Sequence, residues 1–211
     1  MPAPRLVPDL VPDLVLDLAL TVRHDGKGGI ADDLDGVDGL ARWVAARGDE
    51  LAEAGAPLGD FVADEDALTA VRALRQAVRT LFARAVRPAP PSPADAQRLL
   101  PGAEALDRLA AAAARVPVAP RLTWPESAAP EITYVPTASG PPADLLLAAL
   151  ARAATLFLAS DDRTRLRACH APRCVRYFLK EHPRQEWCKP SCGNRARVAR
   201  HHDRHRVESA L

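Results

Sequence analysis

The sequence has few aromatic residues. They make up 4% of the 211 residues, while the hydrophobic fraction reaches 48%. Alanine, leucine and valine therefore carry the apolar content, and this composition favours helices over a β-sandwich. We expect a mostly α fold, which becomes α+β if a short β-hairpin forms.

The sequence also lacks a long uninterrupted apolar run. Because a membrane-spanning helix needs about 18 or more consecutive apolar residues, we expect no membrane span. The apolar N-terminal stretch contains Asp9, Asp13 and Asp17, which the hydrophobic region of a signal peptide would not carry. These absences predict a cytoplasmic protein, in which thiols stay reduced.

Common catalytic and nucleotide-binding motifs are missing. There is no nucleophile elbow, no H-E-x-x-H and no Rossmann fingerprint. The stretch "DGKGG" at 25–29 lacks the frame of a phosphate loop, and "DDLDG" at 32–36 lacks that of a calcium loop. We interpret both as solvated turns, and an enzyme is less expected than a binding protein.

Charge is distributed unevenly along the chain. From Arg163 to Arg206 there are 13 Lys or Arg residues and three acidic ones, whereas the remainder holds 15 basic and 24 acidic residues. The sequence therefore combines an acidic body with a basic C-terminal module. This asymmetry hints at a polyanionic partner, of which nucleic acid is the commonest.

Apolar spacing predicts helices through most of the acidic body. The first begins near residue 13, and the second lies in "VDGLARWVAARG" with Gly48 as its stop. The longest follows Asp64, a suitable N-cap, and Pro88 closes it. "AEALDRLAAAAAR" and "PPADLLLAALARAATLFLAS" predict two more. Between them "RLTW" and "EITYV" could pair as a hairpin, and "PAPPSP" at 88–93 predicts a stiff link.

All cysteines of the chain lie in one window near the C-terminus: Cys169, Cys174, Cys188 and Cys192. The C-x4-C and C-x3-C pairs, separated by 13 residues, suit tetrahedral zinc. Four thiolates leave no open position for a catalytic water, so the expected Zn²⁺ is structural. Disulfides, an iron–sulfur cluster and unrelated buried cysteines remain alternatives, as does replacement of one thiolate by His170 or His182.

The segment after Cys192 predicts a basic helix. Pro190 suits its first turn, and Gly193 suits a tight metal knuckle. Arg197, Arg200 and Arg204 fall within about 60° of one another on such a helix and form a stripe suited to phosphates. Asn194 and Arg195 lie at the start of the helix, where a base edge or a phosphate could be met.

The string "WCKPSCGNRARV" resembles the CGNR zinc-finger family, and "RLRACHAPRCVRYF" is also similar to it. This resemblance implies an N-terminal ABATE domain, described as a stress-induced transcription regulator. "LDLALTV", "LARWV" and "VRALRQAV" resemble successive helices of that domain. The chain departs from the family pattern at Leu20-Thr21, at Lys180 and at Gln185-Glu186.

Together these patterns predict a helical ABATE-like domain over residues 1–160 and a CGNR-type zinc finger, treble-clef-like or ribbon-like, over 161–211. We expect a regulator that contacts DNA through Asn194, Arg195, Arg197, Arg200 and Arg204. Its N-terminal domain would sense a small-molecule effector or form a homodimer. The alternatives are a pathway-specific enzyme and a protein–protein docking module built on the same zinc-finger family.

Overall fold

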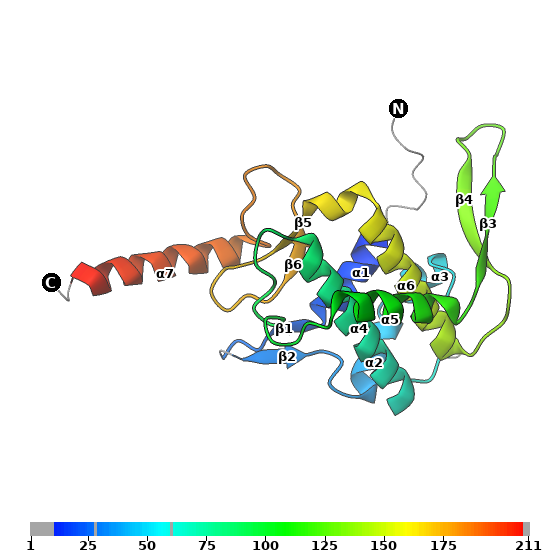
Figure 1. Ribbon diagram of the computed structural model, residues 1–211, viewed down its shortest axis with the longest axis horizontal. Helices are drawn as coiled ribbons and strands as arrows, with labels where there is room; N and C mark the ends of the chain where they lie inside the picture. Colours follow the sequence, from blue (N-terminus) through cyan, green and yellow to red (C-terminus); the bar gives the residue numbers. More distant parts are fainter. Residues whose placement is uncertain (1–10, 28, 60, 209–211) are drawn as a thin grey trace.

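The computed structural model describes residues 11–208 except residues 28 and 60, and omits the side chains of 11, 12, 131, 133 and 203–208. The fold is mostly helical, as predicted (Figure 1). Its first half contains α1 (Val11–Leu20), β1 (Val22–His24), β2 (Ile30–Asp32), α2 (Val37–Ala45), α3 (Gly48–Glu53) and α4 (Glu65–Ala85). Its second half contains α5 (Gly102–Ala114), β3 (Val118–Thr123), β4 (Glu131–Pro136), α6 (Pro142–Ala159), the 3₁₀ helix η1 (Asp161–Arg165), β5 (Leu166–Ala168), β6 (Tyr177–Leu179) and α7 (Pro190–Glu208).

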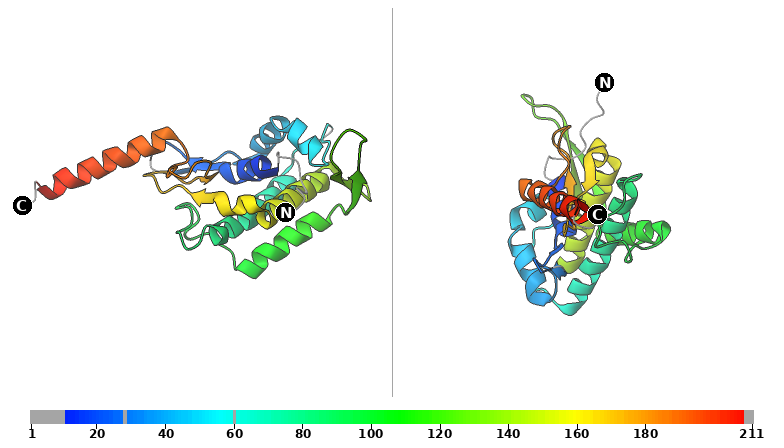
Figure 2. Two further views of the ribbon diagram at one scale, coloured as in Figure 1. Left: turned by 90° about the horizontal axis from the view of Figure 1, so that it is seen from above. Right: turned by 90° about the vertical axis from the view of Figure 1, so that its left-hand side faces the viewer.

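Helix α4 is the longest element of the body. Asp64 caps it, because its side chain accepts a hydrogen bond from the Ala67 amide at 2.7 Å, as the sequence predicted. Leu68, Val71 and Val78 on its apolar face are fully buried. The helix packs against α1, α5 and α6, so it joins the helices of the body into one core (Figure 2).

Helix α6 is both long and strongly apolar. Over 18 residues its mean hydropathy is 1.5, which is enough by length and composition to cross a membrane. In the structure it packs against α1, α4 and α5, and Leu146, Leu150 and Phe157 lie in the core. A buried core helix meets the same criterion, so the absence of a membrane span stays a prediction.

Two antiparallel hairpins flank the helices. The predicted pairing of "RLTW" with "EITYV" is confirmed, because β3 and β4 pair from Val118↔Pro136 to Thr123↔Glu131. The β1–β2 hairpin was not predicted, because its strands are too short to show an alternating pattern. Its turn forms because Asp25 accepts hydrogen bonds from the amides of Lys27 and Gly29.

One local prediction needs correction. Gly48 does not stop the second helix, which ends at Ala45; it is instead the first residue of α3. The segment 88–93 was predicted to be a stiff link, and the structure adds that Ser92 near its end is fully buried and hydrogen-bonded. The start of α3 at Gly48 and the burial of Ser92 both depend on what these segments pack against, which local sequence preferences do not show.

The C-terminal part of the chain shares its core with the body. Leu166, Ala168 and Tyr177 of the β5–β6 hairpin belong to the same buried cluster as α1, α4 and α6. A second, smaller cluster surrounds the cysteines and includes Phe178 and Trp187. The division of the chain at residue 160 stays a prediction.

Candidate metal centre

The first two cysteines lie on a knuckle at the end of the β5–β6 hairpin. The amide of Cys169 donates to the Arg176 carbonyl at 2.9 Å, and the amide of Cys174 donates to the Ala171 carbonyl at 2.9 Å. Arg173 adopts a left-handed conformation with φ of 62°, which turns the chain back on itself before Cys174. The turn therefore brings both sulfurs to one side of the knuckle.

The second pair of cysteines belongs to the start of α7. Cys188 precedes the helix, and Cys192 lies in its first turn with its amide donating to the Lys189 carbonyl at 3.0 Å. Pro190 is the first residue of the helix, as predicted. A hairpin knuckle followed by a helix that carries the last cysteine corresponds to the treble-clef-like alternative.

The four sulfurs converge on one point. All lie within 4.8 Å of one another. The sulfur of Cys188 is 3.7 Å from that of Cys174 and 3.5 Å from that of Cys192. An ion with four Zn–S bonds of about 2.3 Å in tetrahedral geometry places its sulfurs about 3.8 Å apart. The observed distances therefore fit a single tetrahedral ion.

The competing interpretations fit less well. A disulfide needs its sulfurs about 2.05 Å apart, and all four cysteines are free. In a multi-iron cluster, different irons bind the thiolates, which spreads the sulfurs farther apart than one ion does. His170 and His182 are both exposed, and neither belongs to the group of possible ligands found among the described residues.

Protons compete with a cation for these thiols. The hydrogen bond between the sulfurs of Cys169 and Cys174 lowers the pKa of Cys169 and raises that of Cys174. Hydrogen bonds to the same two thiolates, together with burial, raise the pKa of Cys188. A metal ion that binds all four must displace the shared protons, so its affinity should fall as the pH falls.

A small apolar layer supports the second pair of cysteines. A Cβ placed on Gly193 would lie 3.0 Å from Cδ1 of Trp187, so only a glycine lets α7 approach the indole without a shift. Phe178 and Ala171 are buried in the same cluster. This cluster is small, and the metal ion should supply much of the stability of the knuckle.

Arg195 faces the cysteines. Its Nε donates to the Pro172 carbonyl at 3.1 Å, and one terminal nitrogen lies 3.1 Å from the sulfur of Cys192. The guanidinium thus links the first turn of α7 to the Cys169–Cys174 knuckle. Its positive charge also offsets the negative charge of the thiolates. From the sequence, Arg195 was expected only to contact DNA, and its contact with the metal centre was not predicted.

Replacing Arg195 with methionine should weaken metal binding about 10- to 100-fold, the usual effect of removing a partner of a metal ligand. The physical reason is the lost hydrogen bond to Cys192. Competition with a chromophoric chelator measures the affinity directly. Arg197→Met is the matched control, because its guanidinium donates to Asn194 rather than to a cysteine. Equal affinities of the two variants would contradict this role of Arg195.

The other residues predicted to contact DNA lie farther along α7. Asn194, Arg197 and Arg200 are exposed, and the Nε of Arg200 donates weakly to the Ala196 carbonyl at 3.4 Å. Arg204 belongs to the helix, but its side chain lies outside the described residues. Figures 1 and 2 show α7 projecting away from the body, which leaves most of its surface open to a partner.

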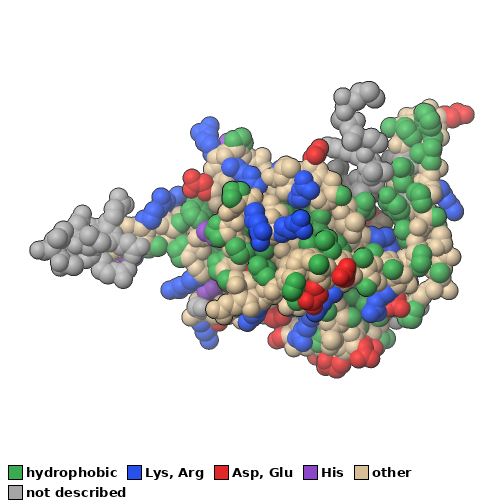
Figure 3. Space-filling model, viewed as in Figure 1, with side chains coloured by type: hydrophobic (Ala, Val, Ile, Leu, Met, Phe, Trp, Pro, Cys, Tyr) green, Lys and Arg blue, Asp and Glu red, His purple; other side chains and the backbone are tan. Residues whose placement is uncertain are grey.

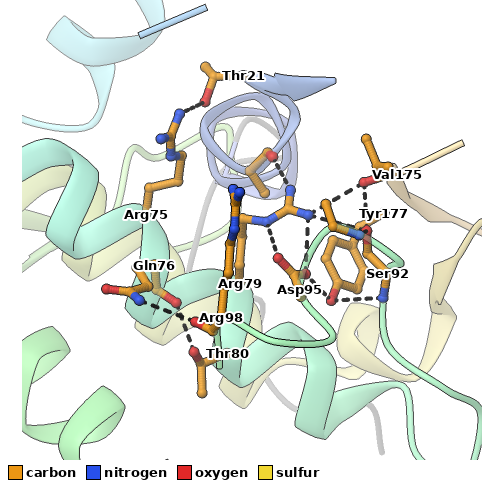
Figure 4. A network of polar contacts seen from close by, with 12 residues as sticks. Thr21, Arg75, Gln76, Arg79, Thr80, Ser92, Asp95, Arg98, Val175 and Tyr177 are labelled. Carbon is orange, nitrogen blue, oxygen red and sulfur yellow. Dashed lines mark hydrogen bonds and ion pairs between the residues drawn. The ribbon is translucent and has the colours of Figure 1, made fainter. Parts of the chain in front are cut away.

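A buried polar network connects the β5–β6 hairpin, which carries the first two cysteines, to the helical body (Figure 4). Arg79 of α4 donates to both carboxylate oxygens of Asp95, at 2.7 and 3.1 Å, and to the carbonyl of Val175 at 3.4 Å. The hydroxyl of Tyr177 donates to Asp95 at 2.7 Å, and that of Ser92 donates to Val175 at 2.8 Å. Burial and the Asp95 carboxylate raise the pKa of Tyr177, so its hydroxyl stays a donor.

This network was not predicted from the sequence. One signal was available, because Arg75 and Arg79 interrupt the apolar stripe of α4, and a buried arginine requires a partner. The partners could not be identified from the sequence, since Asp95 follows the supposed link and Val175 lies 96 residues beyond Arg79.

Comparison with known families covers most of the chain. Residues 12–161 match the ABATE family, whose description is "Putative stress-induced transcription regulator". Residues 165–205 match the CGNR zinc finger. No curated protein matches the chain. Both family matches agree with the resemblance found in the sequence, and the second includes all four cysteines.

Proposed function

The chain belongs to the ABATE family and ends in a CGNR zinc finger, and from this premise we propose that it is a cytoplasmic transcription regulator that binds DNA through the zinc finger. The observation that carries the proposal is α7, a basic helix that projects from the metal centre. Its exposed residues include Arg197 and Arg200. A helix without an apolar face gains little stability from packing against its own protein. The exposed basic side chains of α7 are therefore available to bind a polyanion such as DNA.

Zinc in this proposal is structural. The four cysteines Cys169, Cys174, Cys188 and Cys192 would hold Zn²⁺, since tetrahedral sulfur ligands suit this ion and leave no open position. The ion would join the hairpin knuckle to the first turn of α7 and so fix the direction of the helix. Arg195 would reinforce this junction through Pro172 and Cys192.

DNA contact would come from the part of α7 that is not used by the metal. Arg197, Arg200 and Arg204 would meet phosphates, and Asn194 would lie near the same groove. Arg195 is only partly exposed and would reach a phosphate or base from the edge of the metal centre. On the face shown in Figure 3, several Lys and Arg side chains lie near the base of α7, together with an acidic one, and they extend the positive surface.

The proposal predicts a specific effect of Arg200→Ala. Loss of one phosphate contact should weaken binding to all DNA sequences alike and flatten the log–log dependence of affinity on salt by about one unit. Fluorescence anisotropy with a labelled duplex measures both. Arg84→Ala, an exposed arginine at the end of α4, is the control that should change neither quantity.

The two rival functions make different predictions. A protein–protein docking module would show no retention of DNA by the metal-loaded protein even at low ionic strength. An enzyme would retain a substrate in the helical body, independently of α7. In the proposed regulator the body senses an effector or forms a homodimer.

A further inference from the structure

A cleft of about 560 Å³ opens on the helical body beside α4. Its size falls in the range of small-molecule sites, about 300–1,000 Å³. Its charged walls consist of Arg72, Arg75, Arg79, Arg98 and Asp95. Four arginines and one carboxylate therefore line this cleft, which lies outside the metal centre.

The three arginines on α4 share one face of the helix. Arg72, Arg75 and Arg79 follow one another at intervals of three and four residues, which places them in a row along the helix. Arg98 enters from the segment after Asp95. That segment is held in place because the side chain of Gln76 donates to the Arg98 carbonyl at 3.1 Å.

Two of the four arginines are neutralised within the protein. Arg79 pairs with Asp95 at 2.7 Å, and Arg75 pairs with Asp32 at 2.5 Å. Both pairs are mostly buried, with side-chain exposures of 4% for Arg79 and 9% for Arg75. Arg75 and Arg79, the most deeply buried arginines of its lining, form the floor of the cleft.

The other two arginines have donors to spare. Arg72 uses only its Nε, which donates to the Leu34 carbonyl at 2.7 Å, and its two terminal nitrogens have no partner in the described part of the chain. Within the same residues the guanidinium of Arg98 has no hydrogen-bond or ion-pair partner, and the residue is exposed. Two guanidinium groups with free terminal nitrogens therefore line one cleft.

We infer that this cleft binds a small anion with a phosphate or carboxylate group, held by Arg72 and Arg98 against the floor formed by Arg75 and Arg79. Guanidinium groups match the geometry of both anions through paired N–H donors. An anion would also relieve the repulsion between Arg72 and Arg98, the two arginines without an ion-pair partner. Because two positive charges remain after internal pairing, a doubly charged group is favoured.

Occupation of the cleft would act on the zinc finger. Arg79 and Asp95 line the cleft, and the same side chains bond to Val175 and Tyr177 between Cys174 and the end of β6. An anion that stabilises this wall stabilises the attachment of the metal knuckle. This regulatory consequence rests on the proposed function, whereas the anion site does not.

Titration with inorganic phosphate tests the site without DNA. At constant ionic strength, maintained with chloride, phosphate should raise the melting temperature of the full, zinc-loaded chain in a saturable manner. Arg98→Gln and Arg72→Gln should each weaken the apparent affinity about tenfold or more, as expected for a lost charge-assisted hydrogen bond. Arg42→Gln, an exposed arginine on α2, should leave it unchanged.

Binding to a specific anion site is saturable and depends on Arg72 and Arg98. A general effect of phosphate on protein stability is not saturable and does not depend on these two arginines. A response that is not saturable, or that is equal in Arg98→Gln and Arg42→Gln, would overturn the anion site. Arg72→Gln and Arg98→Gln should leave DNA affinity in phosphate-free buffer unchanged. If instead they weaken it, the cleft contacts the DNA backbone and the small-anion site is wrong.

The coupling has its own measurement. Saturating phosphate should slow the transfer of zinc to a chelator in the wild type and leave the rate unchanged in the Arg72→Gln/Arg98→Gln double variant. An equal effect in both proteins would show that phosphate acts elsewhere, and no effect in either would refute the coupling. Failure of DNA binding would refute the proposed function and would leave the phosphate results intact.

Discussion

Replacing Cys188 with serine should abolish tight zinc binding and unfold the cysteine knuckle and α7, while the helical body and the β5–β6 hairpin that shares its core stay folded. Cys188 lies within 3.7 Å of two other cysteine sulfurs, so no neighbouring residue can take its place at the ion. Binding of structural zinc in small fingers contributes about 10–16 kcal/mol, far more than the cluster of Phe178 and Trp187 can supply.

Limited proteolysis followed by mass spectrometry measures this effect. Cleavage should begin in the knuckle and in α7 and should leave a resistant fragment that contains α1 to α6. Ser191→Ala is a matched control, because Ser191 lies beside Cys192 and is exposed. If the C-terminal module of Cys188→Ser resists cleavage as well as the control does, zinc is not what holds the module together.

Replacing Arg79 with methionine should destabilise the whole protein by about 3–5 kcal/mol, the range for a buried ion pair that loses one partner. The side chains of Arg79 and Asp95 are only 4% and 7% exposed. Removing the guanidinium leaves the Asp95 carboxylate buried with only the Tyr177 hydroxyl as a donor, and it also removes the bond to Val175.

Denaturant unfolding gives the free energy. Arg84→Met, on the exposed side of the same helix, should change it by less than about 0.5 kcal/mol. Adding Asp95→Asn to Arg79→Met should recover part of the loss, because the unpaired charge disappears while an acceptor for Tyr177 remains. Strictly additive losses would show that Arg79 and Asp95 do not act as a pair.

The sequence predicted those features that depend on neighbouring residues. The apolar spacing of α4 and its cap at Asp64 are local, and so is the spacing of the four cysteines. The β3–β4 hairpin was also predicted, because its two stretches of β-favouring residues lie close together in the sequence. In each case the pattern specifies the structure without reference to the rest of the fold.

Features that depend on distant residues could not be predicted. Arg195 looks like any other arginine of a basic helix until Pro172, 23 residues away, is placed beside it. The pair of Arg79 and Asp95 and its bond to Val175 join three separate segments. The arginine-lined cleft likewise exists only because Arg98 is brought opposite α4.

The dependence of DNA affinity on salt tests the central claim most directly. With zinc-loaded protein and a labelled duplex, affinity should fall between about 50 and 200 mM salt. The log–log slope should be about −2 or steeper, since each phosphate contact contributes about −0.9 and at least Arg197 and Arg200 are exposed on α7. Absence of any salt-sensitive retention of DNA at low ionic strength would contradict the account.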